Sequence, residues 1–365
     1  MRAASVDVKR TRKLLLDWYR ANKRAMPWRE TSDPYAIWIS EAMLQQTRVE
    51  TVIPYWQRFL TLFPDVHALA TAELDDVLGA WAGLGYYARA RNLQATARLI
   101  DENHGGRLPD DAETLRTLPG IGRYTAGAVA SIAFDRPEPV LDGNVKRVLT
   151  RLLGIREDIA QPAVVERLWK EAGVLVQGPH PGDLNQALME LGATICTART
   201  PRCANCPVSR FCDARAQGDA ESLPIKTRKK PPRKVEAVAA LVIRRGKALA
   251  VRRPSRGLLG GLWDLPGGDL AAGETPRAGL TRALRERAGL KISRVSAMGA
   301  VEHTFTHRKL TLHVYRASTS TDRIRLDGFA GHKWLAPGAI SSLPHAVVTA
   351  KALGLLISPT VRSSN

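Results

Sequence analysis

Residues 115–146 read LRTLPGIGRYTAGAVASIAFDRPEPVLDGNVK. The first four residues close a short helix, residues 119–122 make a tight turn, and an Ala-rich helix follows. Gly120 and Gly122 have no side chains, so the backbone N–H groups at the start of the second helix can approach a ligand closely. Because partial positive charge collects at a helix N-terminus, the stretch predicts a helix–hairpin–helix that binds a DNA phosphate.

A carboxylate follows this hairpin directly. Asp142 comes after two helix breakers, Pro137 and Pro139, and stands beside a glycine. A DNA-binding hairpin followed by an acidic residue is typical of DNA-repair proteins. The alternative is an ordinary helix–turn–helix corner in which Asp142 only caps the next helix.

Composition indicates a polyanionic partner. The chain has 365 residues, enough for two or three domains, and 54 basic against 35 acidic residues give a formal net charge of +19. Such an excess of positive charge favours binding to DNA or RNA. The alternative is a basic soluble protein that binds no nucleic acid. No apolar run reaches membrane-spanning length, so we expect a cytoplasmic, nucleoid-associated protein.

A second carboxylate lies on an apolar helix face. Asp33 and Pro34 are typical of a helix start, and the helix is predicted to run from residue 35 to about residue 47. Glu41 shares a face with apolar residues such as Ile37 and Trp38, where burial raises the pKa of a carboxyl group. Glu41 is therefore either paired structurally or used in chemistry.

Two further stretches have the composition of DNA-contacting loops. Residues 45–47 form a polar patch close to Glu41, and residues 83–87 form a Gly-punctuated turn that carries Leu84 and Tyr86. Apolar and aromatic loop residues beside arginines suit insertion into a duplex and extrusion of a base. The alternative is that Leu84 and Tyr86 simply pack in a core.

All four cysteines lie within seventeen residues. Their spacing is Cys196-x6-Cys203-x2-Cys206-x5-Cys212, which predicts a metal-centred loop with a structural role. Spacing alone does not separate zinc from a four-iron cluster, and four free thiols are the alternative.

The C-terminal part differs in kind. Residues 226–234 form a basic, proline-containing linker. Beyond it we expect strands at 238–243, 248–251, 293–301 and 309–317 and helices at 276–288 and 346–356, which describes an α+β domain with a mixed or antiparallel sheet.

Together these motifs resemble a known family. WISEAMLQQT, GLGYYARARNL, LPGIGRYTAGA, VLDGNVKRV, ALMELGATIC and the cysteine loop resemble the helix–hairpin–helix DNA glycosylases over nearly the whole chain to residue 216. The chain is most similar to the MutY-type adenine DNA glycosylases, which excise adenine mispaired with 8-oxoguanine and carry a C-terminal domain similar to Nudix hydrolases.

The resemblance implies a fold class and a domain organisation. We expect a mainly α N-terminal region, a six-helix barrel plus an iron–sulfur cluster domain, and an α+β Nudix-like domain. The implied boundaries are residues 1–30 and 139–216 for the cluster domain, 31–138 for the six-helix barrel with the hairpin, 217–235 for the basic linker, and 236–365 for a Nudix-like domain that recognises 8-oxoguanine.

The resemblance also implies catalytic roles. Glu41 falls on the family's general acid, which protonates adenine N7, and Asp142 on the carboxylate that stabilises or traps the oxocarbenium-like sugar. Two carboxylates in unlike environments can divide these tasks. Asn144 is expected to hold the sugar, a water or the carboxylate. Where bifunctional relatives carry a Schiff-base lysine this chain has Tyr124, so we expect a monofunctional enzyme and a Tyr124 hydroxyl bonded on the Asp142 side.

The remaining site residues are carried over in the same way. Trp28, Arg29 and Glu190 are implied to line the adenine pocket, Gln46, Leu84 and Tyr86 to wedge the duplex, and Gly120 and Gly122 to hold the DNA backbone. Phe305, Thr306 and His307 match the loop that reads 8-oxoguanine, with Thr306 where the family has serine. Cys196, Cys203, Cys206 and Cys212 are implied to bind a [4Fe-4S] cluster.

The Nudix motif is incomplete in this chain. Its scaffold positions are kept, but two carboxylates that would bind magnesium are replaced by Ala283 and Arg287. We therefore expect no nucleotide pyrophosphatase activity.

Three rival functions stay open at this stage. They are a bifunctional endonuclease III-like glycosylase/lyase for oxidised pyrimidines, a non-catalytic iron–sulfur DNA-binding protein, and a nucleotide hydrolase with a DNA-targeting arm. The lyase is disfavoured by Tyr124, which cannot form a Schiff base. The non-catalytic protein is disfavoured by the pair Glu41 and Asp142, and the hydrolase by Ala283 and Arg287. The expected partner is duplex DNA with an adenine:8-oxoguanine or adenine:guanine mispair, bound by a monomer.

Overall fold

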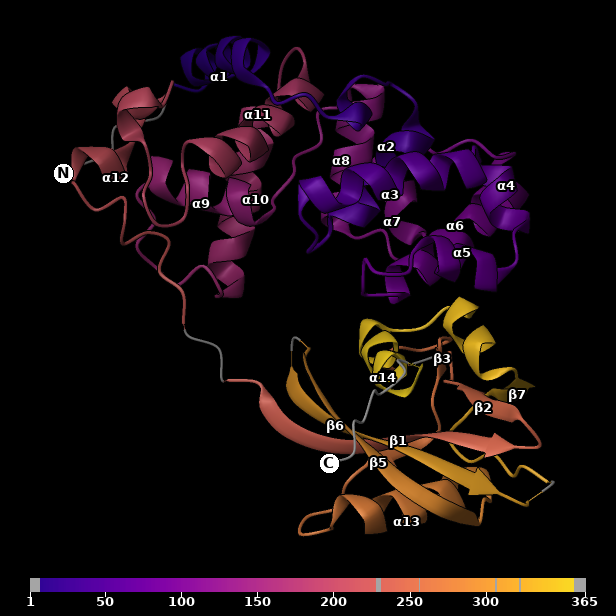
Figure 1. Ribbon diagram of the computed structural model, residues 1–365. Coiled ribbons are helices and arrows are strands. Elements are labelled where there is room, and N and C mark those ends of the chain that lie inside the picture. The colour runs from indigo at the N-terminus through magenta and orange to yellow at the C-terminus, as the bar shows by residue number, and fades with distance from the viewer. Residues whose placement is uncertain (1–6, 228–230, 256, 306, 322, 358–365) are drawn as a thin grey trace. The chain divides into compact units, whose positions relative to one another are not determined.

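A computed structural model describes residues 7–227, 231–255, 257–305, 307–321 and 323–357. The chain divides into two compact units, residues 1–71 with 92–229 and residues 72–91 with 230–365. The first is helical, and the second is built on a β-sheet (Figure 1). Among the described residues, no helix is long and apolar enough to cross a membrane. The finer domain boundaries given above stay a prediction.

The first unit confirms the mainly α expectation. Its elements are α1 (Val8–Asn22), η1 (Pro27–Arg29), α2 (Pro34–Leu44), α3 (Val49–Leu62), α4 (Val66–Thr71), most of α6 (Ala88–His104), α7 (Ala112–Thr117), α8 (Arg123–Phe134), α9 (Gly143–Leu152), α10 (Pro162–Val176), α11 (Pro181–Thr194), η2 (Cys203–Asn205), η3 (Ser209–Phe211) and α12 (Asp213–Ala216).

Helix α2 begins as predicted and ends three residues early. The Asp33 side chain accepts hydrogen bonds from the backbone N–H groups of Tyr35 and Ala36, and Pro34 occupies the first helical turn. The predicted continuation to Thr47 is wrong, because Gln45 leaves the helical conformation and Gln46 has a φ of 60°. The polar patch is therefore a bend at the end of α2.

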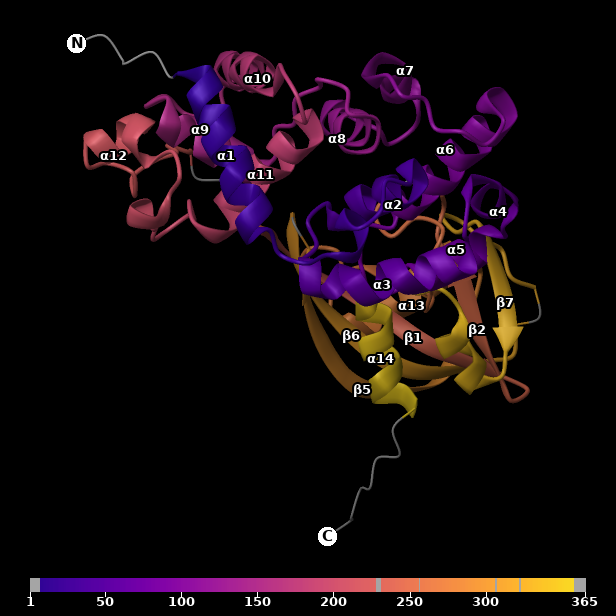
Figure 2. The same cartoon turned by 90° about the horizontal axis from the view of Figure 1, so that it is seen from above.

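Helix α8 packs against both α2 and α11 (Figure 2). Its residues from Thr125 to Ser131 are all buried, which requires small side chains on every face. Close approach is tightest at Gly127, where an added Cβ would stand 2.2 Å from the Pro139 carbonyl oxygen. Small residues in α8 thus let the segment that leads to Asp142 lie directly against the helix.

Gly127→Ala is expected to destabilise the protein by about 1–3 kcal/mol, because the new methyl group meets backbone that cannot rotate away. Gly173→Ala in α10 is the matched control. A Cβ there meets nothing within 4 Å, so this variant should gain about 0.5–1 kcal/mol from helix propensity. Denaturant unfolding measures both changes, and equal stabilities would contradict the close packing at Gly127.

The second unit contains α5 (Leu74–Ala80) and a seven-stranded sheet. Its other elements are β1 (Arg233–Arg244), β2 (Lys247–Arg252), β3 (Trp263–Asp264), β4 (Gly267–Asp269), α13 (Pro276–Ala288), β5 (Ile292–Thr304), β6 (Arg308–Thr319), β7 (Gly331–Leu335), η4 (Pro337–Ser342) and α14 (Val347–Ile357). The strand order is β3-β2-β1-β6-β5, with β4 paired to β1 and β7 to β2. Because β1 and β6 are parallel while the other pairs are antiparallel, the expected mixed sheet is confirmed.

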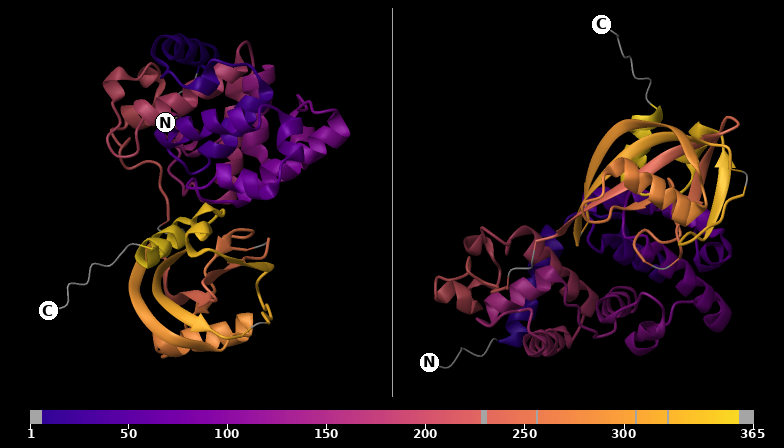
Figure 3. Two further views of the ribbon diagram at one scale, coloured as in Figure 1. Left: turned by 45° about the vertical axis from the view of Figure 1, so that its right-hand side comes forward. Right: turned by 90° about the horizontal axis from the view of Figure 1, so that it is seen from below.

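Helices cover both faces of this sheet. Residues 237–242 of β1 are all buried, as expected for a strand enclosed on two sides. Alternate residues Val238, Ala240 and Val242 form a core with Leu280 and Leu284 of α13. Helix α14 packs against β5 and β6, and Figure 3 shows the sheet between the two helices. This is the layered α+β domain that the C-terminal pattern predicted.

Candidate active site

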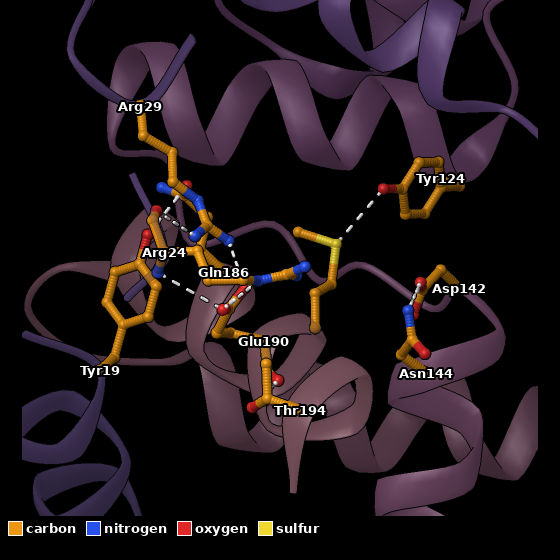
Figure 4. Close-up of polar contacts among 10 residues, drawn as sticks. Tyr19, Arg24, Arg29, Tyr124, Asp142, Asn144, Gln186, Glu190 and Thr194 are labelled. Atoms are coloured by element: carbon orange, nitrogen blue, oxygen red, sulfur yellow. Dashed lines mark hydrogen bonds and ion pairs between the residues drawn. The ribbon is translucent and has the colours of Figure 1, made fainter. Parts of the chain in front are cut away.

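All four predicted catalytic residues line one cavity in the helical unit. Its volume is about 670 Å³, within the range of small-molecule sites. Side chains reach it from η1, α2, α8, the start of α9, and α11. The predicted residues in its wall are Trp28, Arg29, Glu41, Gln46, Tyr124, Asp142, Asn144 and Glu190. Figure 4 shows how several of these side chains converge.

Glu41 is a buried carboxyl group in the wall of this cavity. Its residue is 5% exposed, and its Oε2 accepts a 2.8 Å hydrogen bond from the Tyr124 hydroxyl. Burial raises the pKa of Glu41 to about 7, although the Tyr124 hydrogen bond opposes this shift. The nearby charge of Asp142 raises the pKa further, and that of Arg29 lowers it. Glu41 can therefore hold a proton near neutral pH.

Tyr124 contacts the carboxyl group of Glu41, whereas we expected a bond on the Asp142 side. Its hydroxyl donates to Glu41 and also lies 3.3 Å from the Met189 sulfur, so the expected bond on the Asp142 side is wrong. The reason is geometric, because α8 packs against α2 and aims the second residue of α8 at the inward face of α2. Burial raises the pKa of the Tyr124 phenol well above its usual range, so this group acts as a donor and not as a phenolate.

Asp142 is the N-cap of α9. Its Oδ1 accepts a 2.7 Å hydrogen bond from the Val145 backbone N–H, and its Oδ2 accepts a 2.9 Å bond from the Asn144 side-chain amide. Burial raises the pKa of Asp142 above its usual range, although these two hydrogen bonds and the charge of Arg147 oppose the shift. A carboxylate held from both sides at a helix N-terminus is fixed in position and favourably placed. The capping and chemical interpretations of Asp142 are thus compatible.

A hydrogen-bonded chain links Asp142 to the cysteine loop. Asn144 Oδ1 accepts a 2.8 Å bond from Arg147 Nη2, and Arg147 Nε donates a 2.7 Å bond to the Cys196 carbonyl oxygen. Arg147 also donates to the Gly192 carbonyl oxygen at 2.7 Å. The start of α9, the end of α11 and the cysteine loop are therefore held by one guanidinium group.

Glu190 lines the cavity but is engaged by two arginines. Its side chain is fully buried, Arg24 Nε donates to Oε1 at 2.6 Å, and Arg29 Nη2 donates to Oε2 at 2.9 Å. These guanidinium groups lower the pKa of Glu190 despite its burial. Glu190 is thus an anchor for the arginine side of the cavity, and the aromatic wall beside it includes Trp28, which packs edge-on against Trp56 at 6.0 Å.

Sequence reasoning missed several residues of this wall, and three of them stand beside the predicted ones. Gln186, Met189 and Arg24 all line the cavity, and Gln186 accepts a 3.0 Å hydrogen bond from the Tyr19 hydroxyl. Gln186, Met189 and Glu190 stand three and four residues apart, which places them on one face of α11. That spacing is a signal in the sequence, whereas nothing in the sequence points to Arg24.

The predicted DNA-contacting residues differ in exposure. Gln46 and Tyr86 are exposed, with positive φ values that place both on bends, whereas Leu84 is buried. The core-packing alternative therefore holds for Leu84. Gly120 has a φ of 77° and an added Cβ would stand 2.6 Å from the Asn92 side chain, so the hairpin needs glycine there.

The predicted reading loop joins β5 and β6. Phe305 packs edge-on against His303 at 4.5 Å, and its backbone N–H bonds the Arg308 carbonyl oxygen at 2.8 Å. Phe305 and His307 line a second cavity of about 810 Å³, whose wall in the same unit includes Tyr86. Thr306, the predicted substitution for serine, lies outside the described residues.

The four cysteines surround one small cavity, and none of them forms a disulfide. Burial raises the pKa of Cys206 to about 12, and repulsion from the neighbouring cysteines adds to the shift. Arg151, almost fully buried, donates a 3.3 Å hydrogen bond to the Cys196 sulfur. Within the described part of the chain, no three His, Cys, Asp or Glu side chains form a single-ion site. Four mutually repelling sulfurs beside a donor fit a cationic multi-iron cluster, which would hold the loop together.

The degenerate Nudix positions have structural roles. Ala283 is buried in the core, and Arg287 donates to the carbonyl oxygens of Gly267 at 2.8 Å and Gly328 at 3.1 Å. Glu274 is paired with Arg282 at 2.8 Å, which lowers the pKa of Glu274 to about 2. The guanidinium group of Arg287, bonded to main-chain carbonyl oxygens, thus occupies the position of a magnesium ligand.

Comparison with known proteins agrees with both units. Residues 39–173 match the HhH-GPD superfamily of base excision DNA repair proteins, residues 196–212 the iron–sulfur binding domain of endonuclease III, and residues 238–355 the NUDIX domain. The rat adenine DNA glycosylase is 39% identical over 90% of this chain and 74% of its own length. The human adenine DNA glycosylase is 40% identical over 82% of this chain, which spans 65% of that relative.

Among solved structures, the helical part is similar to a thermostable thymine-DNA glycosylase. The TM-score is 0.53 at 29% identity, over 57% of this chain and 97% of that one. With the match at residues 196–212, the four cysteines are the ligands of a [4Fe-4S] cluster, and the choice left open by their spacing is settled against zinc.

Proposed function

This chain belongs to the adenine DNA glycosylases, a family of N-glycosylases, and we propose that it removes adenine mispaired with 8-oxoguanine or guanine from duplex DNA. The observation that carries the proposal is the pair Glu41 and Asp142 in the wall of one cavity, with unlike surroundings. The reaction would begin base excision repair, on DNA bound by a single copy of the chain.

Glu41 acts as the general acid in this proposal. Cleavage of an N-glycosidic bond leaves electrons on the departing base, and a proton on adenine N7 makes that base a better leaving group. A positioned acid contributes roughly 10²–10⁴-fold to such a step. The pKa of Glu41, about 7, suits this task, because proton donors are most effective when their pKa lies near the working pH. Tyr124 orients the acid through its 2.8 Å hydrogen bond.

Asp142 acts on the sugar. As the base leaves, positive charge develops on the sugar ring, and a fixed carboxylate stabilises it or forms a transient bond with the anomeric carbon. Asn144 and the Val145 N–H hold Asp142 so that little reorganisation is needed. Water then completes the hydrolysis and leaves an abasic site.

Tyr124 limits the reaction to base removal. A phenol cannot form the Schiff base that leads to strand cleavage, and the buried Tyr124 hydroxyl is committed to Glu41. This observation favours the proposed function over the bifunctional alternative.

Duplex binding is supported by charge and by exposed residues. The formal net charge is +19, and Gly120 and Gly122 lie exposed at the hairpin where α8 begins. Gln46 and Tyr86 each stand on an exposed bend, where each can contact a distorted duplex. Phe305 and His307 are assigned to the 8-oxoguanine opposite, supported by their shared cavity with Tyr86.

The test is incubation with a duplex that carries adenine opposite 8-oxoguanine, read with and without alkali. We expect free adenine, and strand breaks only after alkali treatment. An otherwise identical duplex with adenine opposite thymine should stay intact. Strand breaks without alkali would overturn the monofunctional assignment, and duplex binding without adenine release would overturn the enzymatic one.

Adenine release is expected to decline as the pH rises above about 7, because Glu41 then loses the proton it must deliver. Tyr124, Asp142 and Arg29 are the charged or titratable groups that act on Glu41 here. The measurement is the single-turnover rate across neutral pH, with duplex binding followed in parallel as the control. A rate that climbs steadily above pH 7 would rule out Glu41 as a proton donor.

The C-terminal domain is expected to hydrolyse no nucleotide pyrophosphate, with or without magnesium. Arg287 occupies a ligand position with a guanidinium group, and Glu274 is paired with Arg282. Pyrophosphate release from nucleoside triphosphates measures this, with an intact Nudix hydrolase as the positive control. Magnesium-dependent release would contradict the structural roles given to these residues.

A further inference from the structure

The sulfur of Met189 contacts the tyrosine hydroxyl that orients the proposed general acid, Glu41. Met189 projects from α11 into the cavity wall and is partly exposed there. Its sulfur lies 3.3 Å from the Tyr124 hydroxyl oxygen, the contact drawn as a dashed line in Figure 4. The same hydroxyl donates to Glu41 Oε2 at 2.8 Å. Two acceptors therefore compete for one phenolic proton.

In the reduced protein this competition favours Glu41. A thioether is a weak acceptor, a carboxyl oxygen is a strong one, and a phenol has a single proton to donate. The distances agree, since the bond to Glu41 is the shorter one. Oxidation would convert the Met189 thioether, now the weaker acceptor, into a sulfoxide whose oxygen is a strong hydrogen-bond acceptor.

We propose that Met189 is an oxidation site through which a peroxide switches off the general acid. The inference rests on the function proposed above and adds a mode of regulation to the same site. In the reaction, one oxygen of hydrogen peroxide is transferred to the Met189 sulfur and water leaves. The sulfur is oxidised by two electrons and the peroxide is reduced by two, with no other co-reactant.

The consequence follows from the hydrogen bonds. In its active form Glu41 is protonated, so it offers Tyr124 the carbonyl oxygen of a neutral acid, which a sulfoxide oxygen outcompetes. Tyr124 then turns to Met189 and Glu41 loses its orienting partner. The sulfoxide also places a polar oxygen in the cavity that receives the base.

Other methionines of the described chain are less suited to this role. Met43 is fully buried, and Met26, which lines the same cavity, is only 4% exposed, whereas Met189 is partly exposed and contacts the Tyr124 hydroxyl. Met298 is partly exposed but belongs to β5 of the second unit. Met298 is therefore the matched control, a reachable methionine without a catalytic neighbour.

The experiment oxidises the full-length, cluster-loaded protein with graded hydrogen peroxide. Peptide mass analysis gives the fraction of sulfoxide at each methionine, and the visible absorbance of the cluster shows that it stays intact. We expect adenine release to decline in step with oxidation of Met189, by about tenfold or more out of the ~10²–10⁴-fold that a positioned acid contributes. Methionine sulfoxide reductases should restore the rate.

Variants separate this effect from general damage. Each variant is compared with its own untreated rate: Met189→Leu should resist peroxide, while Met298→Leu should lose activity as the wild type does. Tyr124→Phe is the second test, because without the hydroxyl the sulfoxide has no proton to divert and peroxide should slow this variant less. Full Met189 oxidation at an unchanged rate, or a Met189→Leu protein as sensitive as the wild type, would overturn the proposal.

A readout without substrate keeps the two proposals distinguishable. The infrared C=O stretch of protonated Glu41, identified by its loss in Glu41→Gln, should move to higher frequency when Met189 is oxidised, since a hydrogen bond is removed. If the untreated protein releases no adenine but the Glu41 band moves on oxidation of Met189, the proposed function is wrong and the transfer of the Tyr124 hydrogen bond to Met189 is confirmed. If the band does not move, the diverted bond is refuted whatever the activity.

Discussion

Glu41→Gln is expected to lower single-turnover adenine release by roughly 10²–10⁴-fold while duplex binding is kept. Glutamine has nearly the volume of glutamate, and its amide oxygen can still accept the Tyr124 hydrogen bond. What it lacks is an acidic proton for the departing base. The effect should therefore fall on the chemical step and leave the affinity for the mispair unchanged.

The same substitution should not destabilise the fold. The pKa of Glu41 is raised from 4.5 to about 7, so between these values the native state binds more protons than the unfolded state. Stability from this group then falls as pH rises through that window, and at neutral pH the buried carboxylate is a cost that glutamine removes. Thermal unfolding near neutral pH should show a variant at least as stable as the wild type.

Glu113→Gln in α7 is the matched control, because it makes the same chemical change at an exposed position outside the cavity. Its adenine release should equal that of the wild type. If Glu41→Gln releases adenine at the wild-type rate, or loses activity only by unfolding, Glu41 is not the acid.

Asp142→Asn is expected to lower adenine release by about 10²–10³-fold, the size of effect seen when a preorganised electrostatic group is removed. Asparagine is also a good N-cap, so it can still accept from the Val145 N–H, and α9 should stay folded. The change removes the negative charge that faces the sugar. Adenine release under single turnover and duplex affinity, measured side by side, separate chemistry from binding.

Asp111→Asn controls for the loss of a capping charge. Asp111 caps α7 and accepts from the Thr114 N–H at 2.7 Å, as Asp142 does for α9, but it is exposed and lies outside the cavity. This variant should lose no adenine release. If both variants behave alike, Asp142 is a cap and no more, and the alternative given at the outset is the correct one.

Much of the fold follows from local signals in the sequence. Asp33 and Pro34 begin α2 where expected, and Thr275 followed by Pro276 begins α13. Local chemistry decides these starts, because capping side chains bond backbone groups two or three residues away. The close cysteine spacing predicted a metal loop for the same reason, since its ligands are near one another along the chain.

The errors arose where distant segments decide the outcome. Helix α2 ends before the polar patch, and Tyr124 bonds Glu41 instead of the Asp142 side. Glu190 lines the cavity as expected, but only the structure shows that Arg24 and Arg29 hold it from a segment some 160 residues away. Nothing in a single local pattern reports such a partner.

Local patterns in the chain are enough to predict the residue types of the site, the family they resemble and the main helices and strands. These depend on periodicity, caps and spacing, which act within a few residues. Packing of distant segments brings Tyr124 to both Glu41 and Met189, connects Asn144 to the cysteine loop through Arg147, and buries Glu41 so that its pKa is about 7. The physical reason is that protonation and hydrogen bonding depend on which groups exclude water from one another, and packing brings those groups together from separate parts of the chain.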